Sequence, residues 1–134
     1  MMGITVFTDP NQLRGVTDRI HDRWFDSAEI TFNENKATLT IPFFDRTVQA
    51  PGFRSFEKVE SVRPFGFLKI YHVASYTIRD TEKVGLYDFN KFTYDARKKR
   101  LLMHTGVPIE IEITVTQFEL ALEELPYEST DTTT

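Results

Sequence analysis

Residues 28–43 read AEITFNENKATLTIPF, and this stretch predicts the fold. Apolar and polar residues alternate on both sides of the polar turn NENK at 33–36. Alternation with a period of two places apolar side chains on one face of a sheet and polar side chains on the other. The stretch therefore predicts an amphipathic β-hairpin with one face in water. The positions expected to face the core are Ala28, Ile30, Phe32, Ala37, Leu39, Ile41 and Phe43, with Glu29, Thr31, Thr38 and Thr40 facing outward.

The same pattern continues through most of the chain. Residues 65–79 predict one long strand whose even-numbered positions, including His72, Ala74 and Tyr76, face the core. Residues 84–95 and 100–105 predict two more strands joined by the charged turn ARKK at 96–99, and 53–63 predict a weaker one. The segments 31–39 and 93–101 share several residue types at equal offsets, which indicates either similar hairpin chemistry or an internal duplication.

The last predicted strand has the clearest alternation. Four β-branched residues, at 109, 111, 113 and 115, alternate with Glu110, Glu112 and Thr114. After Thr116 and Gln117 the apolar pattern shifts by one residue. A β-bulge explains the shift without ending the strand, and a short terminal helix is the alternative.

One helix is predicted, near the N-terminus. Asp9 is a good N-cap, Pro10 fits the first helical position, and Gln12 completes a capping box. Residues Leu13, Val16, Ile20 and Trp24 then recur at spacings of three and four, which is one face of a helix. We expect this helix to contact the sheet through that face and to end at RIHDRWFD, residues 19–26.

Together these elements predict a mainly β (α+β) protein. Its N-terminal helix packs on a curved antiparallel sheet or partly open barrel of about seven or eight strands, because a twisted sheet of that size tends to curl. With 134 residues the chain has the usual size of one domain, expected over 1–125. Residues 126–134 have little to bury and are expected to form a disordered tail.

Composition excludes several classes of function. The net charge is −4, and residues 101–134 carry seven acidic residues but neither lysine nor arginine, which argues against nucleic acid as a partner. Cysteine is absent, so no thiol chemistry is available, and a reducing compartment is favoured. No signal peptide and no apolar run of membrane-spanning length is visible. The sequence thus predicts a cytoplasmic protein without membrane contact.

Catalytic and metal motifs are also missing. No nucleophile elbow, phosphate loop or dinucleotide fingerprint is present. The adjacent pair His21-Asp22 is expected to be structural, since it falls in the last helical turn. The three histidines show no short ligand spacing, so we expect no metal and no cofactor. The protein is therefore more consistent with binding than with catalysis.

Residues 20–43, IHDRWFDSAEITFNENKATLTIPF, resemble the opening of small bacterial domains, some of them similar to immunity proteins of toxin systems. The shared pattern is His-Asp, a few residues, a strand, a polar turn and a second strand. The resemblance covers about a fifth of the chain. It implies a protein that acts by binding another protein rather than by catalysis.

Two functional hypotheses follow. The first is a binding module that uses Glu110 and Glu112 to contact a basic protein partner. Neutralisation within the chain is the competing explanation of these acids, with Lys58, Arg63 or Lys69 as possible partners. The second hypothesis is a small-ligand site or enzyme that uses a cavity in the curled sheet near His72, Tyr76 and His104.

Overall fold

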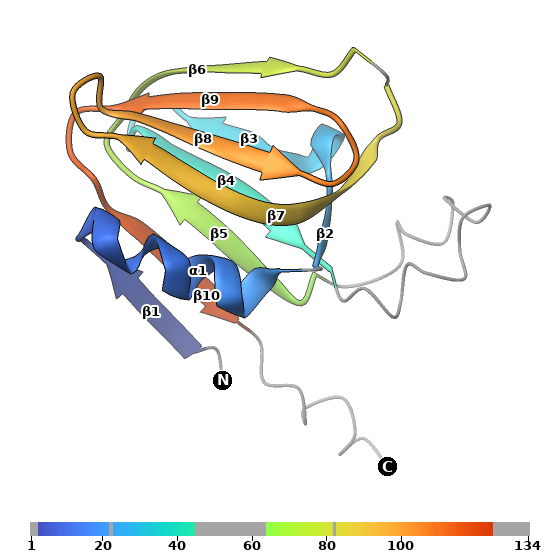
Figure 1. The fold of residues 1–134 in the computed structure, drawn as a ribbon, viewed down its shortest axis with the longest axis horizontal. Helices are drawn as coiled ribbons and strands as arrows, with labels where there is room; N and C mark the ends of the chain where they lie inside the picture. The colour runs from blue at the N-terminus through green and yellow to red at the C-terminus, as the bar shows by residue number, and fades with distance from the viewer. Residues whose placement is uncertain (1–2, 22, 45–63, 82, 125–134) are drawn as a thin grey trace.

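The computed structural model describes residues 3–21, 23–44, 64–81 and 83–124. Within them ten strands form two antiparallel sheets that curl into a half-barrel, with a single α-helix near the N-terminus (Figure 1). The mainly β fold with one N-terminal helix is thereby confirmed. The first sheet has the order β1 (Gly3–Phe7), β10 (Leu120–Glu124), β5 (Gly66–Ile70), β4 (Thr38–Phe43) and β3 (Thr31–Asn33). The second has the order β2 (Trp24–Asp26), β7 (Leu86–Asp95), β8 (Arg100–Thr105), β9 (Glu110–Val115) and β6 (Val73–Arg79).

The hairpin predicted from 28–43 is present as β3 and β4, which pair Phe32 with Leu39. The core positions of β4 are fully buried as expected. Two details differ. The first strand begins only at Thr31, because Ser27–Glu29 form a 3-10 helix (η2) capped by Asp26. Thr38, expected on the outer face, is nevertheless buried, and its hydroxyl donates to the Lys36 carbonyl oxygen at 3.0 Å.

The predicted long strand at 65–79 is wrong as a single element. It is broken at Tyr71 and His72 into β5 and β6, which belong to different sheets. His72 has φ of 57°, in the left-handed region, so the chain turns sharply there. Neither His72 nor Ala74 faces the core, contrary to prediction. Tyr76 does face inward, opposite Ile113, but it lies at the sheet margin and stays 41% exposed.

A second corner lies beside the first. β9 ends at Val115 and β10 begins at Leu120 in the other sheet, so the shift near Thr116 and Gln117 is neither the predicted bulge nor a helix. Three hydrogen bonds join the two corners: Thr116 N to His72 O at 2.9 Å, Tyr71 N to Glu119 O at 3.0 Å, and His72 Nε2 with Glu119 Oε1 at 2.8 Å. The chain therefore crosses between the sheets twice at one place, which curls them into the half-barrel.

The helical segment begins as predicted. Asp9 and Gln12 form the capping box around a short 3-10 turn (η1, Pro10–Gln12), which continues into α1 (Leu13–Ile20). Leu13, Val16 and Ile20 are buried, and α1 packs against β7. The prediction that Trp24 extends this helical face is wrong.

Trp24 instead begins β2, whose position links the two sheets. Its backbone pairs with Asp88 of β7 and also exchanges two hydrogen bonds with Phe44, just beyond β4. The following residue, Phe25, is fully buried and its ring lies 4.8 Å from that of Phe89. Strand β2 therefore closes one side of the half-barrel.

The two charged or polar turns predicted from the sequence are present, close to the expected positions. Tight turns lie at 34–37, one residue later than NENK, and at 96–99, which is ARKK. They end on Ala37 and Lys99, which both have positive φ. Each of these residues accepts a backbone hydrogen bond at a corner, from Val73 and Val115. The strand predicted at 53–63 and the tail at 126–134 lie outside the described residues.

Candidate functional site

The outer face of the second sheet carries the acidic residues that the sequence singled out. On β9, Ile111, Ile113 and Val115 are buried, while Glu110 and Glu112 lie on the opposite side of the strand. The side chain of Glu110 is 68% exposed and that of Glu112 is 44% exposed. The alternation expected for this strand is therefore confirmed.

Each of these carboxylates has a cationic neighbour from an adjacent strand. Arg79 of β6, opposite Glu110 in the register, places Nη1 3.1 Å from Glu110 Oε1. Arg100 of β8 places Nη1 3.8 Å from Glu112 Oε1. The outer face thus carries charges of both signs and is not a purely acidic surface.

The arginines are not the partners that the sequence suggested. Lys69 lies on the first sheet and pairs with Glu123 there, at 2.9 Å. Lys58 and Arg63 lie outside the described residues. The register of the strands determines which cation lies beside each glutamate, and it can be known only when the strand pairing is known.

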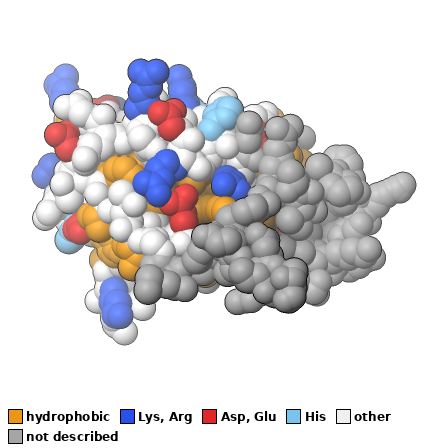
Figure 2. All heavy atoms as spheres, turned by 90° about the horizontal axis from the view of Figure 1, so that it is seen from below, with side chains coloured by type: hydrophobic (Ala, Val, Ile, Leu, Met, Phe, Trp, Pro, Cys, Tyr) orange, Lys and Arg blue, Asp and Glu red, His pale blue; other side chains and the backbone are white. Residues whose placement is uncertain are grey.

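Mixed charge is not confined to this sheet. Figure 2 shows another side of the molecule, where basic and acidic side chains are interspersed and apolar patches lie between them. Charges of both signs close together produce no large single-sign field.

A shallow hollow of about 330 Å³ lies between β8 and β9. It brings together three sequence candidates, Glu110, Glu112 and His104. Its other lining residues are Leu102, Met103, Thr105, Pro108, Ile109 and Ile111. The hollow thus combines an apolar floor with two carboxylates and an imidazole at its surface.

His104 is held by a neighbour on β7. Its Nε2 lies 3.0 Å from Thr93 Oγ1, within hydrogen-bond distance. Phe92 and Met103 precede these two residues on their strands, pair with each other and are buried. Because side chains alternate along a strand, Thr93 and His104 project from the outer side of the sheet. The imidazole is therefore oriented at the hollow rather than in the core.

The three residues of the small-ligand hypothesis do not converge. His72 lies at the corner with Glu119, Tyr76 lies beside Phe32 at the margin of the second sheet, and His104 lies on the outer face. Between the sheets, in the part of the chain that the structure describes, buried apolar side chains from both sheets form one continuous cluster. The geometry gives the small-ligand hypothesis no common site for these residues.

Two further features bear on chemistry. Among the described residues, no group of three histidine, aspartate or glutamate side chains is placed to hold a metal ion. No helix in the described ranges is both long and apolar enough to cross a membrane.

Sequence reasoning missed a polar cluster at Asp80 and Tyr87. The Tyr87 hydroxyl donates to Asp80 and accepts from the backbone N–H groups of Val84 and Gly85, at 3.1 and 3.2 Å. Asp80 also accepts from the Ser27 hydroxyl at 3.2 Å. Burial raises the pKa of Tyr87, and the Asp80 carboxylate raises it further. The cluster fastens the loop between β6 and β7, and no sequence motif announces it.

Comparison of the chain with models of known families, with curated proteins and with solved structures finds no match. The function is therefore inferred from the geometry of the described residues.

Proposed function

We propose that this protein is a binding module, and that it contacts a protein partner through the outer face of β6, β9 and β8. The observation that carries the proposal is the position of Glu110 and Glu112. Both lie on one exposed face, beside a hollow with an apolar floor. Apolar centres surrounded by polar, solvent-accessible groups are typical of protein interfaces.

The ion pairs on this face leave room for a partner. An exposed pair contributes at most about 1 kcal/mol to stability, so exchanging one cation for another costs little. The side chains of Glu110 and Arg79 are each about two-thirds exposed, so each can also pair with an oppositely charged side chain of a partner. A partner with a lysine or arginine opposite each glutamate would match the face.

The shape of the site also favours a protein over a small ligand. The hollow is open to solvent and shallow, whereas small-ligand sites bury most of the ligand surface. A stable protein interface buries about 800 Å² on each partner and extends well beyond such a hollow. A non-enzymatic role in the cytoplasm is part of this proposal.

Affinity capture from the native host tests the proposal. Wild-type protein should retain a partner that the variant Glu110→Lys/Glu112→Lys loses. The matched control is Asp18→Lys/Glu29→Lys, which makes the same charge change at two exposed acids outside β6, β8 and β9. The control should capture the partner as well as wild type does.

Salt dependence provides a second criterion. Wild-type protein should capture less of the partner as ionic strength rises, because exposed charges are screened beyond about 10 Å at 0.1 M salt. Identical sets of proteins captured by wild type and by Glu110→Lys/Glu112→Lys would refute the role of this face.

A further inference from the structure

The half-barrel is open on one side, where two sheet margins face each other. β3 is the last strand of the first sheet and β6 is the last strand of the second. The ring of Phe32 on β3 lies 5.1 Å from the ring of Tyr76 on β6, measured between centroids. A shallow, open groove of about 650 Å³ lies at this opening, lined by Thr31, Phe32, Asn33, Glu34 and Tyr76.

Phe32 and Tyr76 are each the last residue in a row of cross-strand neighbours whose other members belong to the core. Phe32 follows Leu39, Ile70 and Leu120 across the first sheet, and these three are buried. Tyr76 follows Ile113 and Leu101 across the second sheet, and these are buried too. Tyr76 itself remains 41% exposed. Each row therefore lacks a further side chain on its solvent side, where an additional strand would supply one.

Strand β6 has the chemistry of a strand that accepts another. It has seven residues, and only the last, Arg79, is charged. Ala74, Ser75, Tyr76 and Thr77 are exposed in succession. Natural sheet margins are commonly protected by lysine, proline or short length, because an unprotected margin presents free N–H and C=O groups. Within the described part of the chain, β9 is the only strand that pairs with β6.

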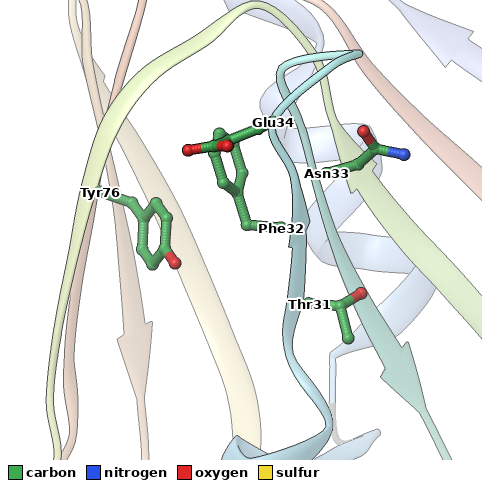
Figure 3. A pocket seen from close by; sticks show the side chains of 5 residues that line it. All are labelled: Thr31, Phe32, Asn33, Glu34 and Tyr76. Carbon is green, nitrogen blue, oxygen red and sulfur yellow. The ribbon is translucent and has the colours of Figure 1, made fainter.

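Charge specifies the occupant. Figure 3 shows the rings of Phe32 and Tyr76 facing the same space, with the Glu34 carboxylate directed to that side, whereas Thr31 and Asn33 point away. Glu34 is the one charged residue among the five that line the groove, and it is exposed. A cationic side chain on the occupant would therefore have its counter-charge at Glu34.

We infer that the groove between β3 and β6 binds an extended segment of a partner protein. The segment adds to β6 as a further strand, in the manner of β-augmentation. Apolar side chains at alternate positions cover Phe32 and Tyr76, and a lysine or arginine lies beside Glu34. This surface is distinct from the hollow on the outer face and does not depend on it.

Selection from a display library of short random peptides tests the inference. Enriched peptides should alternate apolar and polar residues and carry a lysine or arginine at a fixed position. On binding, the amide NMR signals of β6 should shift. Those of β1, an uncharged strand at the far margin of the first sheet, should not.

Charge exchange makes the test specific. Glu34→Lys should weaken the selected peptide about fivefold, and replacing the basic residue of the peptide by glutamate should restore affinity for that variant. Because Glu34 is exposed, folding should be unaffected. Asp18→Lys and Glu110→Lys/Glu112→Lys should both bind the peptide as wild type does.

Several results would overturn the inference. They are a failure to enrich alternating sequences, an unchanged affinity in Glu34→Lys, and shifts at β1 in place of β6. Concentration-dependent self-association with shifts at β6 would also overturn it, because a second copy would then be the occupant.

Discussion

Arg79 and Glu110 face each other across β6 and β9 and form an ion pair of 3.1 Å in which both side chains remain about two-thirds exposed. A pair in this setting is held in water and contributes little to stability. It nevertheless fixes where the two charges lie on the outer face. The same relationship, at 3.8 Å, joins Arg100 to Glu112.

The variant Glu110→Lys/Glu112→Lys should therefore fold nearly normally. We expect the loss in its free energy of unfolding, measured in urea, to be at most about 1 kcal/mol for each of the two broken ion pairs. A loss well above that sum would show that the pairs are structural, and the variant could then no longer be used to test binding.

Replacing Tyr87 by phenylalanine should destabilise the protein by about 1–3 kcal/mol at neutral pH. The N–H groups of Val84 and Gly85 lose their acceptor, and Asp80 loses a donor. Urea unfolding of Tyr87→Phe at pH 7 measures this loss.

The same residue predicts an alkaline limit to stability. In the unfolded chain tyrosine ionises near pH 10, whereas the pKa of Tyr87 is raised in the folded protein by burial and by Asp80. Above pH 10 the unfolded chain therefore loses this proton before the folded protein does, and the free energy of unfolding falls as pH rises. Tyr94, whose pKa is also raised by burial, contributes in the same direction. The decline should be shallower in Tyr87→Phe, and an equal slope in both proteins would contradict this explanation.

The left-handed backbone at His72 should make this position sensitive to β-branching. His72→Val and His72→Gly both remove the contact with Glu119, so loss of that contact does not account for a difference between them. Valine is strained at positive φ and glycine is not, so the valine variant should be less stable by about 2 kcal/mol. Thermal or urea unfolding of the two proteins measures the difference. Equal stability would mean that the corner does not require its present conformation.

Phe25 and Trp24 should respond differently to substitution. Phe25 is fully buried, and Phe25→Ala should cost about 3–5 kcal/mol. Trp24 is only half-buried, and its Nε1 is a buried donor without a hydrogen-bond partner in the described part of the chain. Trp24→Phe should thus change stability by no more than about 1 kcal/mol, since it removes an unsatisfied group. A larger loss in Trp24→Phe than in Phe25→Ala would contradict the placement of β2.

The residues of β9 show how much the sequence could predict. Alternation placed Glu110 and Glu112 outside and their neighbours inside, because this property depends only on strand geometry. The identity of their cationic partners could not be predicted in the same way. Arg79 becomes a neighbour of Glu110, and Arg100 of Glu112, only through the register of three separate strands.

The corner at His72 shows what the sequence could not predict. The residues Tyr71, His72 and Val73 contain no glycine or proline, and they continue an alternating run. The break depends on hydrogen bonds from Thr116 and to Glu119, far along the chain. The strand β1 was also missed, although ITVF at 4–7 is a short β-branched and aromatic run of the kind that forms strands.

The proposed binding role of the outer face is tested most directly by site-specific photo-crosslinking in the native host. Thr77 is exposed and lies opposite Glu112, so a photoreactive amino acid at this position reports contacts on the face. We predict one discrete cross-linked partner from position 77 that is lost with Glu110→Lys/Glu112→Lys and is absent when the probe replaces Asp18 on α1. A partner captured equally from both positions, or retained after charge reversal, would contradict the proposal.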